Sequence, residues 1–279
     1  MKLRFTKMHG AGNDFVVLDG RPGMPPLTDA QIRRLCHRSF GIGCDQLLIV
    51  GSARDAAEDY SFRIFNPDAS EAAQCGNGLR CVARWLADHG LLKGQRVRIG
   101  ALGGVVAAEL LADGQVRVVM GVPRFEPDDV PFVAERRAER YALSVDGRTH
   151  EIGAVSMGNP HAVLRVARIE DAAVATLGAA IEQHERFPQR VNVGFMQRLD
   201  AERIRLRVWE RGVGETMACG TGACAAVAWG RLAAELGPRV SVELPGGTLV
   251  IEWRGEGETL SMTGPATTVF TGEVEISTP

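Results

Sequence analysis

A four-residue motif occurs twice in the sequence and constrains the fold more than any other feature. The first copy spans residues 75–78 (CGNG) and the second spans residues 219–222 (CGTG). Each copy follows a short apolar segment and precedes an Ala/Leu/Val-rich segment with helical spacing. The sequence therefore predicts a thiol and two glycines at the start of a helix, at two places in one chain.

Three further pairs of similar segments accompany the motif, in the same order in both halves of the sequence. They lie at offsets of 144 or 146 residues and are 12–18 with 158–164, 45–49 with 191–195, and 62–66 with 206–210. The two cysteine motifs are also 144 residues apart. A nearly constant offset over four repeats indicates that the chain is a duplicated fold with two similar halves.

Short strands dominate each half, and few segments have helical spacing. We expect strands at 2–8, 15–18, 47–50, 62–65, 97–99, 116–120, 203–209, 240–244, 249–253 and 259–263, and helices at 28–38, 78–89 and 222–236. The last two helices carry small and apolar residues on several faces, which indicates burial. The predicted fold class is α/β (α+β), with a curled, mainly antiparallel sheet around one central helix in each half.

The boundary between the halves is expected near residue 120. Residues 121–140 interrupt the repeat and are interpreted as a connector. We expect an N-terminal half over residues 1–119, completed by a returning C-terminal strand within 265–279, and a C-terminal half over residues 120–264.

The charge and hydropathy of the chain exclude several classes of partner. A formal net charge of −2 gives no basic surface for nucleic acid or for an anionic membrane. The N-terminal residues contain no apolar signal core, and no apolar stretch is long enough to span a bilayer. We expect a cytoplasmic protein.

The six cysteines include no C-x-x-C pair and no zinc-site spacing, so no metal is predicted. We interpret four of them, Cys36, Cys44, Cys81 and Cys224, as small buried apolar residues. Cys75 and Cys219 differ because helix N–H groups and the helix dipole favour a nearby carboxylate and lower a thiol pKa. Two such thiols on opposite faces of one ligand are suited to two-base racemisation or epimerisation.

Cofactor-free chemistry is the favoured hypothesis for these thiols. Pyridoxal phosphate needs a Schiff-base lysine, and the only lysines are Lys2, Lys7 and Lys93, none in a motif. No glycine-rich phosphate loop of the Walker or Rossmann type is present either.

Together these segments resemble the diaminopimelate epimerase family. The resemblance covers almost the whole chain and rests on residues 7–15 (KMHGAGNDF), 66–70 with 74–78, 158–161 (GNPH), and 210–212 with 218–222. It implies a cofactor-independent epimerase that interconverts LL- and meso-diaminopimelate in the biosynthesis of lysine and peptidoglycan precursors. It also implies two pseudosymmetric domains, an active site in the cleft between them, and a homodimer.

The resemblance assigns a role to each matching residue. Cys75 and Cys219 would be the acid/base thiols, with His161 as the proton partner of Cys75 and Glu210 as that of Cys219. Arg211 would bind the distal carboxylate of the substrate. The remaining polar groups and backbone N–H groups that would bind substrate are those of Asn13, Gln46, Asn66, Gly76, Asn77, Asn159, Asn192, Glu210, Gly220 and Thr221.

The chain departs from the family pattern at three positions. The family usually has Ala and Gly where this chain has Pro67 and Ala69. It also often has a tyrosine associated with dimer contacts where this chain has Phe270, which is therefore the expected dimer contact.

Two alternatives remain open at the level of sequence. A proline racemase-like enzyme would use the same two-thiol chemistry on a smaller substrate. A non-catalytic amino-acid-binding protein would keep the glycines and asparagines but would not need both thiols.

Overall fold

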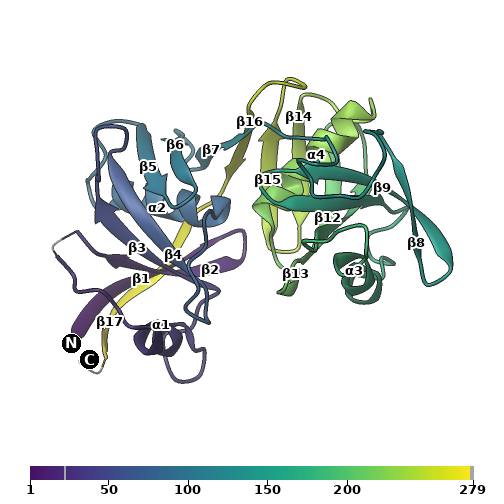
Figure 1. The fold of residues 1–279 in the computed structure, drawn as a ribbon. Coiled ribbons are helices and arrows are strands. Elements are labelled where there is room, and N and C mark those ends of the chain that lie inside the picture. Colours follow the sequence, from purple (N-terminus) through teal and green to yellow (C-terminus); the bar gives the residue numbers. More distant parts are fainter. Residues whose placement is uncertain (22, 277–279) are drawn as a thin grey trace. The chain divides into compact units, whose positions relative to one another are not determined.

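The computed structural model describes residues 1–21 and 23–276, which form two compact units (Figure 1). Unit 1 comprises residues 1–118 and the C-terminal segment that begins at Gly264, and unit 2 comprises residues 119–263. The strand expected within residues 265–279 is β17 (Thr267–Glu275), and residues 277–279 lie outside the described residues.

Unit 1 is a strongly curled sheet with two helices. Along its ladder, β1 pairs with β2 antiparallel, β2 with β3 parallel, β3 with β4 antiparallel, β4 with β5 parallel, and β5 with β6 and β6 with β7 antiparallel. β17 adds to the other side of β1. The elements are β1 (Lys2–Gly10), β2 (Asn13–Asp19), α1 (Asp29–Cys36), β3 (Gln46–Ser52), β4 (Tyr60–Phe65), α2 (Gly76–Asp88), β5 (Arg96–Ala101), β6 (Gly104–Leu110) and β7 (Val116–Gly121).

Unit 2 repeats the same ladder. Strands β9, β10, β11, β12, β14, β15 and β16 pair in the same antiparallel and parallel order as β1 to β7. The elements are β8 (Tyr141–Val145), β9 (Arg148–Ser156), β10 (Pro160–Arg165), α3 (Val174–Glu182), β11 (Asn192–Arg198), β12 (Arg203–Glu210), β13 (Gly214–Thr216), α4 (Gly220–Leu232), β14 (Arg239–Leu244), β15 (Gly247–Glu252) and β16 (Leu260–Gly264). The internal duplication predicted from the repeats is confirmed by this common topology.

The register of the parallel strands shows how closely the halves correspond. Phe15 lies opposite Gln46 where β2 meets β3, and His161 lies opposite Asn192 where β10 meets β11. These four residues occupy matching positions in the sequence repeats. The duplication therefore places two predicted site residues, Gln46 and Asn192, at the same point of their own sheets.

The helix that follows each cysteine motif is buried in its unit, as predicted (Figure 1). In α2 even Arg80 is fully buried, and its guanidinium Nε donates to the carbonyl of Pro265 at 3.2 Å. In α4 the run from Ala223 to Gly230 is buried on every face. Both helices begin two residues earlier than predicted, because each cysteine is itself the N-cap and both glycines of each motif lie inside the helix.

The structure corrects the interpretation of residues 121–140 as a connector. This segment belongs to unit 2, where Val130 and Phe132 are part of the hydrophobic core with Tyr141 and Phe187. Its irregular backbone misled the prediction, because apolar residues spaced by prolines match neither strand nor helix periodicity. The predicted elements also did not include β6, the β8–β9 hairpin, β10, α3, β11 and β13. No helix among the described residues has the length and apolar character needed to cross a membrane.

Candidate active site

In unit 1 the Cys75 thiol sits at the N-terminus of α2. Cys75 is the N-cap residue, with extended backbone, and its carbonyl accepts the first helical hydrogen bond from Leu79 at 2.8 Å. Its Sγ accepts the Gly78 N–H at 3.3 Å, in the way a serine oxygen caps a helix. Cys75 is half-buried. The thiol is therefore fixed by backbone geometry and still within reach of a ligand.

The second glycine of each motif lies in a closely packed position. A Cβ at Gly78 would lie 3.3 Å from the Leu48 side chain and 3.4 Å from Cys75 Sγ. A Cβ at Gly222 would lie 3.1 Å from the Val208 side chain and 3.3 Å from Cys219 Sγ. A larger residue at either position would have to displace these neighbours by a few tenths of an ångström, so glycine favours the close approach of the helix to its sheet.

Polar amides surround Cys75. The Asn13 Oδ1 accepts a hydrogen bond from Asn77 Nδ2 at 3.2 Å and lies 4.0 Å from Cys75 Sγ. A second pair lies at the ends of β3 and β4, where Gln46 Nε2 donates to Asn66 Oδ1 at 2.9 Å. Five predicted residues of unit 1 thus form two hydrogen-bonded groups on neighbouring elements.

Pro67 and Ala69, two of the departures from the family pattern, lie in a tight turn next to Asn66. The Ala69 N–H donates to the Asn66 carbonyl at 2.9 Å, and the Asn66 N–H donates to the Ser70 carbonyl at 2.9 Å. Ala69 has a φ of 71°, in the left-handed region that favours glycine. The glycine usual in the family suits this conformation. Proline, which has no N–H, suits position 67 because neither of these two hydrogen bonds has its donor there.

In unit 2 the Cys219 thiol occupies the matching N-cap position of α4 and is buried. Its Sγ lies 3.6 Å from the Thr221 hydroxyl, which accepts from Asn159 Nδ2 at 3.5 Å. The Asn159 Oδ1 lies 3.0 Å from His161 Nε2. The structure therefore connects Cys219 to His161 through Thr221 and Asn159.

The pKa of the Cys219 thiol is raised well above its usual value, and the predicted lowering is wrong for this residue. Burial makes the largest contribution, and the negative charge and hydrogen bond of Glu210 add to it. The hydrogen bonds with Thr221 and the Gly222 backbone lower the pKa of Cys219, but their contributions are smaller than that of burial. Cys219 is consequently held as a thiol, beside a carboxylate that can accept its proton.

Glu210 is fixed in turn by a residue that the sequence analysis missed. The Thr216 hydroxyl on β13 donates to Glu210 Oε1 at 2.5 Å. No sequence pattern marks Thr216, because the contact depends on β13 folding back antiparallel on β12.

The imidazole of His161 is neutral and fully buried. Burial, with a smaller contribution from the Arg211 charge, lowers the pKa of His161 to about 3. An amide oxygen can only accept, so Nε2 carries the hydrogen that is shared with Asn159 Oδ1. Nδ1 then bears a lone pair and has no hydrogen-bond partner among residues 1–21 and 23–276. This nitrogen can accept a proton.

The buried His161 predicts loss of stability in acid. The unfolded chain binds the proton near pH 6.5, whereas folded His161 binds it near pH 3, so lowering the pH through this window favours unfolding. We expect the melting temperature to fall less between pH 7 and pH 4 in His161→Gln than in wild type. Calorimetry checks this, with the half-buried His150→Gln as the control; equal falls in both variants would contradict the prediction.

Asn192 holds two backbone segments and leaves little of its amide for a ligand. Its Nδ2 donates to the Pro160 carbonyl at 2.9 Å, and its Oδ1 accepts the Arg211 N–H at 3.0 Å. The Arg211 guanidinium is exposed, and its Nη1 donates to the Gln189 carbonyl at 2.9 Å. Asn192 is thus better placed to position Arg211 than to contact substrate.

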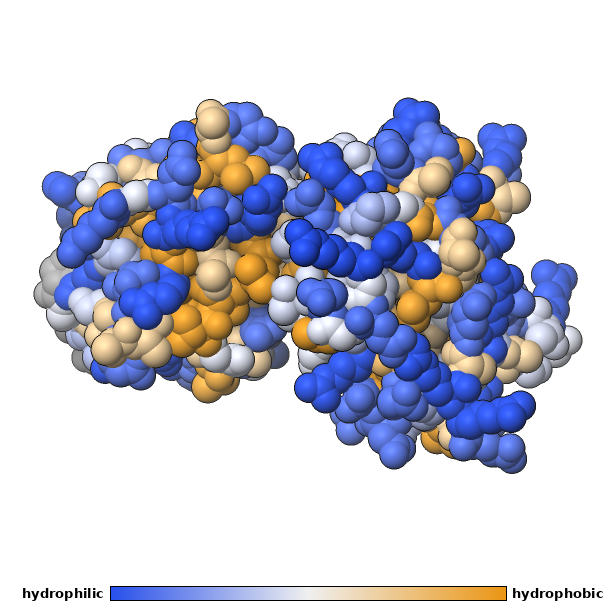
Figure 2. Space-filling model, turned by 90° about the horizontal axis from the view of Figure 1, so that it is seen from above, coloured by the Kyte–Doolittle hydropathy of each residue, from blue (hydrophilic) through white to orange (hydrophobic). Residues whose placement is uncertain are grey.

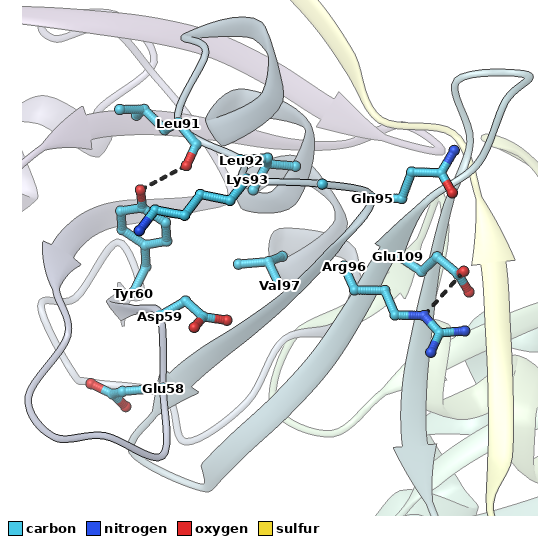
Figure 3. A pocket seen from close by; sticks show the side chains of 11 residues that line it. Glu58, Asp59, Tyr60, Leu91, Leu92, Lys93, Gln95, Arg96, Val97 and Glu109 are labelled. Carbon is cyan, nitrogen blue, oxygen red and sulfur yellow. Dashed lines mark hydrogen bonds and ion pairs between the residues drawn. The ribbon is translucent and has the colours of Figure 1, made fainter.

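Unit 1 also contains a cavity of about 770 Å³ between β4, β5 and the segment after α2 (Figure 3). None of the predicted site residues lines it. Several of its charged groups are already paired, as in the Arg96–Glu109 bond, and the Tyr60 hydroxyl donates to the Leu91 carbonyl at 2.8 Å. Within the described residues, no cluster of His, Cys, Asp and Glu has the arrangement of a metal site. The two cysteine motifs remain the centres of the candidate active site.

Comparison with known proteins identifies a family. A sequence model described as diaminopimelate epimerase matches residues 5–126 and 153–269. The diaminopimelate epimerase of Chromobacterium violaceum is 55% identical over 276 residues, covering 99% of this chain and 100% of that protein. The one from Nitrosospira multiformis is 54% identical over 276 residues, covering 99% of both.

Solved structures show the same fold at much lower identity. A hydroxyproline epimerase from Agrobacterium vitis with bound trans-4-hydroxy-L-proline has a TM-score of 0.71 and 19% identity, covering 100% of this chain and 94% of that chain. A phenazine biosynthesis protein of the PhzF family from Bacillus anthracis has a TM-score of 0.72 and 17% identity, covering 99% of this chain and 100% of that chain. The predicted fold class is confirmed by these similarities.

Proposed function

The chain belongs to the diaminopimelate epimerase family, and we propose that it epimerises LL- to meso-2,6-diaminopimelate with two cysteine thiols and no cofactor. One observation carries the proposal. Two units of the same topology each place a cysteine at the N-cap of a buried helix whose first turn contains two glycines. A reaction that removes a hydrogen from one face of carbon and returns one to the other face needs two such groups.

The chemistry divides between the two thiols. One cysteine, as thiolate, removes the α-hydrogen, and the other, as thiol, donates a proton to the opposite face of the resulting carbanion. Glu210 takes the proton of Cys219 when Cys219 acts as the base, which its charge and its hydrogen bond to the thiol support. His161 serves Cys75 in the same role, with the lone pair of Nδ1 as the proton acceptor.

Stabilisation of the carbanion is the main energetic requirement. The α-hydrogen is a far weaker acid than a thiol, and enzymes lower comparable barriers by roughly 8–23 kcal/mol. The N–H groups at the start of a helix, here those of Gly76, Gly220 and Thr221, are not used by the hydrogen bonds of the helix itself. Directed at the substrate carboxylate, they stabilise the negative charge that develops there.

The family assignment weakens both alternatives. The family is one of isomerases, whereas a binding protein needs neither Glu210 nor a buried His161 near its ligand. The solved proline racemase and hydroxyproline epimerase relatives share only the fold, at 20% and 19% identity. We further propose that the product serves lysine and peptidoglycan synthesis in the cytoplasm, where the six free thiols would remain reduced.

Proton NMR in D2O tests the proposed function. LL-diaminopimelate and L-proline are offered separately to the reduced protein without added cofactor. Loss of the α-proton signal with diaminopimelate alone, together with formation of the meso isomer, is the expected result. Exchange with proline alone would overturn the substrate, and exchange with neither would overturn the enzymatic proposal.

Arg211 is proposed to bind the distal carboxylate of the substrate. Lysine keeps the charge but lacks the planar pair of donors. Because a hydrogen bond to a charged group contributes about 1.5–3 kcal/mol, we expect Arg211→Lys to raise KM by roughly 10- to 100-fold and to change kcat little. Steady-state kinetics check this, with the exposed Arg190→Lys as the control. A large fall in kcat at unchanged KM would contradict the assignment.

We also propose a homodimer that buries Phe270. The side chains of β17 are exposed along most of its length, and Val269 and Phe270 are among the exposed large apolar residues of unit 1. Figure 2 shows hydrophobic residues at the surface of unit 1, which is on the left in that view. The Phe270 ring packs edge-on against the Phe5 ring, with 5.9 Å between the ring centroids.

Introducing charge at Phe270 tests the dimer. A carboxylate at the centre of an apolar contact is strongly unfavourable, so Phe270→Glu is expected to sediment as a monomer at micromolar concentration while wild type sediments as a dimer. Val105→Glu, at another exposed apolar position of unit 1, is the control. An unchanged dimer in Phe270→Glu would place the interface elsewhere.

A further inference from the structure

We propose that Asp45 is a positioning residue that fixes the Asn13 side-chain amide, so that the amide oxygen faces the Cys75 thiol. The inference rests on the proposed function, in which Cys75 is an acid/base group. It adds a role for a carboxylate that the sequence patterns do not assign and that is not itself expected to touch substrate.

The contacts of Asn13 define its orientation. Asn13 Nδ2 donates to Asp45 Oδ2 at 2.9 Å, and the Asp14 N–H donates to the same oxygen at 3.1 Å. An ionised carboxylate can only accept hydrogen bonds, so the NH2 group of Asn13 must point to Asp45. The oxygen is left on the other side, where it accepts from Asn77 Nδ2 and faces Cys75 Sγ.

A group of charged side chains holds Asp45 in place. Arg38 Nη2 donates to Asp45 Oδ1 at 2.6 Å and to Asp14 Oδ1 at 2.8 Å. The Lys7 ammonium group binds Asp14 as well. Burial opposes ionisation of Asp14, but the hydrogen bonds from Arg38 and Lys7 outweigh it and lower the pKa of Asp14 to about 2. One oxygen of Asp45 is therefore occupied by Arg38, and the other is directed at Asn13.

The corresponding asparagine of unit 2 is oriented by a different residue. Asn159 matches Asn13, but the residue that matches Asp45 is Val191, which has no polar side chain. Asn159 instead directs its oxygen to His161 and its NH2 to Thr221, on the Cys219 side. An amide oxygen thus faces Cys75, whereas an amide donor faces the group next to Cys219. The duplicated asparagines present opposite ends to the two thiol sites.

Substituting Asp45 by asparagine should reverse the Asn13 amide. The Arg38 guanidinium can only donate, and its charged hydrogen bond is stronger than the one from the Asp14 N–H. The oxygen of the new asparagine therefore turns to Arg38 and its NH2 turns to Asn13, with loss of the hydrogen bond from the Asp14 N–H. Asn13 then presents its oxygen to residue 45 and its NH2 to Cys75. A donor near sulfur stabilises the thiolate, which the rate of Cys75 alkylation reports.

The test measures alkylation of Cys75 by iodoacetamide at pH 7.5, with the modified peptide quantified by mass spectrometry. We expect the rate to rise about three- to tenfold in Asp45→Asn, because the larger thiolate fraction outweighs the lower nucleophilicity of a more acidic thiol. The double variant Asn13→Asp/Asp45→Asn, which again has only oxygen facing Cys75, should return to the wild-type rate or below it.

Asp59→Asn is the matched control. Asp59 also accepts from an arginine, at 2.9 Å, and from a backbone N–H, at 2.8 Å, and its exposure of 42% is close to the 43% of Asp45. Among the residues that the structure describes, it has no hydrogen bond with an asparagine, and we expect no change in the alkylation rate. If Asp45→Asn does not fold, Asp45→Ala leaves Asn13 free to turn and should give a smaller rise.

A wild-type alkylation rate in folded Asp45→Asn would overturn the inference. A rate that stays high in the double variant would also overturn it, because a loosened site rather than amide orientation would then be the cause. The proposed function is tested separately from the alkylation rates. It fails if Cys75→Ala retains turnover. For turnover by Asp45→Asn, we expect kcat to fall roughly tenfold or more with KM within threefold of wild type.

Discussion

Cys75→Ala and Cys219→Ala are each expected to lower kcat for epimerisation by roughly 10⁴-fold or more. Neither alanine can donate or accept a proton, and a two-base reaction stops when either base is missing. The double variant should be hardly worse than each single variant, because groups that act as a unit are strongly non-additive. Residual α-hydrogen exchange in D2O should be confined to one stereoisomer in Cys75→Ala and to the other in Cys219→Ala.

The same two helices supply matched controls for the cysteine variants. Cys81 lies in α2 and Cys224 in α4, and both are buried. Burial raises the pKa of Cys81 to about 12, which keeps it a thiol. We expect Cys81→Ala and Cys224→Ala to be slightly less stable and to keep kcat within about threefold. Full activity in Cys75→Ala or Cys219→Ala would end the two-thiol proposal.

Glu210→Gln is the substitution with the second largest expected effect. Glutamine keeps the size of the side chain but cannot take the proton of Cys219, so kcat should fall by about 10²- to 10⁴-fold. Removal of the charge also lowers the pKa of Cys219, because the Glu210 charge is one of the causes that raise it. When Cys219 acts as the acid, its thiol is then lost at lower pH, and the basic limb of the kcat profile moves to lower pH.

Measuring the pH dependence of kcat in both reaction directions checks the role of Glu210. The control is Glu215→Gln on the neighbouring β13, where Glu215 pairs with Arg207 and is not a predicted site residue. We expect its kcat to stay within about twofold of wild type. A Glu210→Gln enzyme with wild-type kcat and an unmoved basic limb would show that another group serves Cys219.

Local sequence was sufficient for much of the fold. Strands β3 and β12 are rich in β-branched and other apolar residues between turn residues, and the Thr28 side chain caps α1 by accepting the Gln31 N–H. Burial of α2 and α4 followed from their composition. α3 was missed because its N-cap, Ala173, makes no side-chain hydrogen bond that would mark its start.

The sequence by itself determined the duplication, the family, and which two thiols differ from the other four, because these depend on residue types at fixed spacing. Only the tertiary structure decided the state of each group. Cys219 and His161 have perturbed pKa values because folding removes water from them and brings Glu210 or Arg211 close. The hydrogen bonds of Thr216 and Asp45 were also decided by the tertiary structure, because their partners lie on other strands. Hydrogen bonding and desolvation depend on distances between segments, and spacing along the chain does not contain those distances.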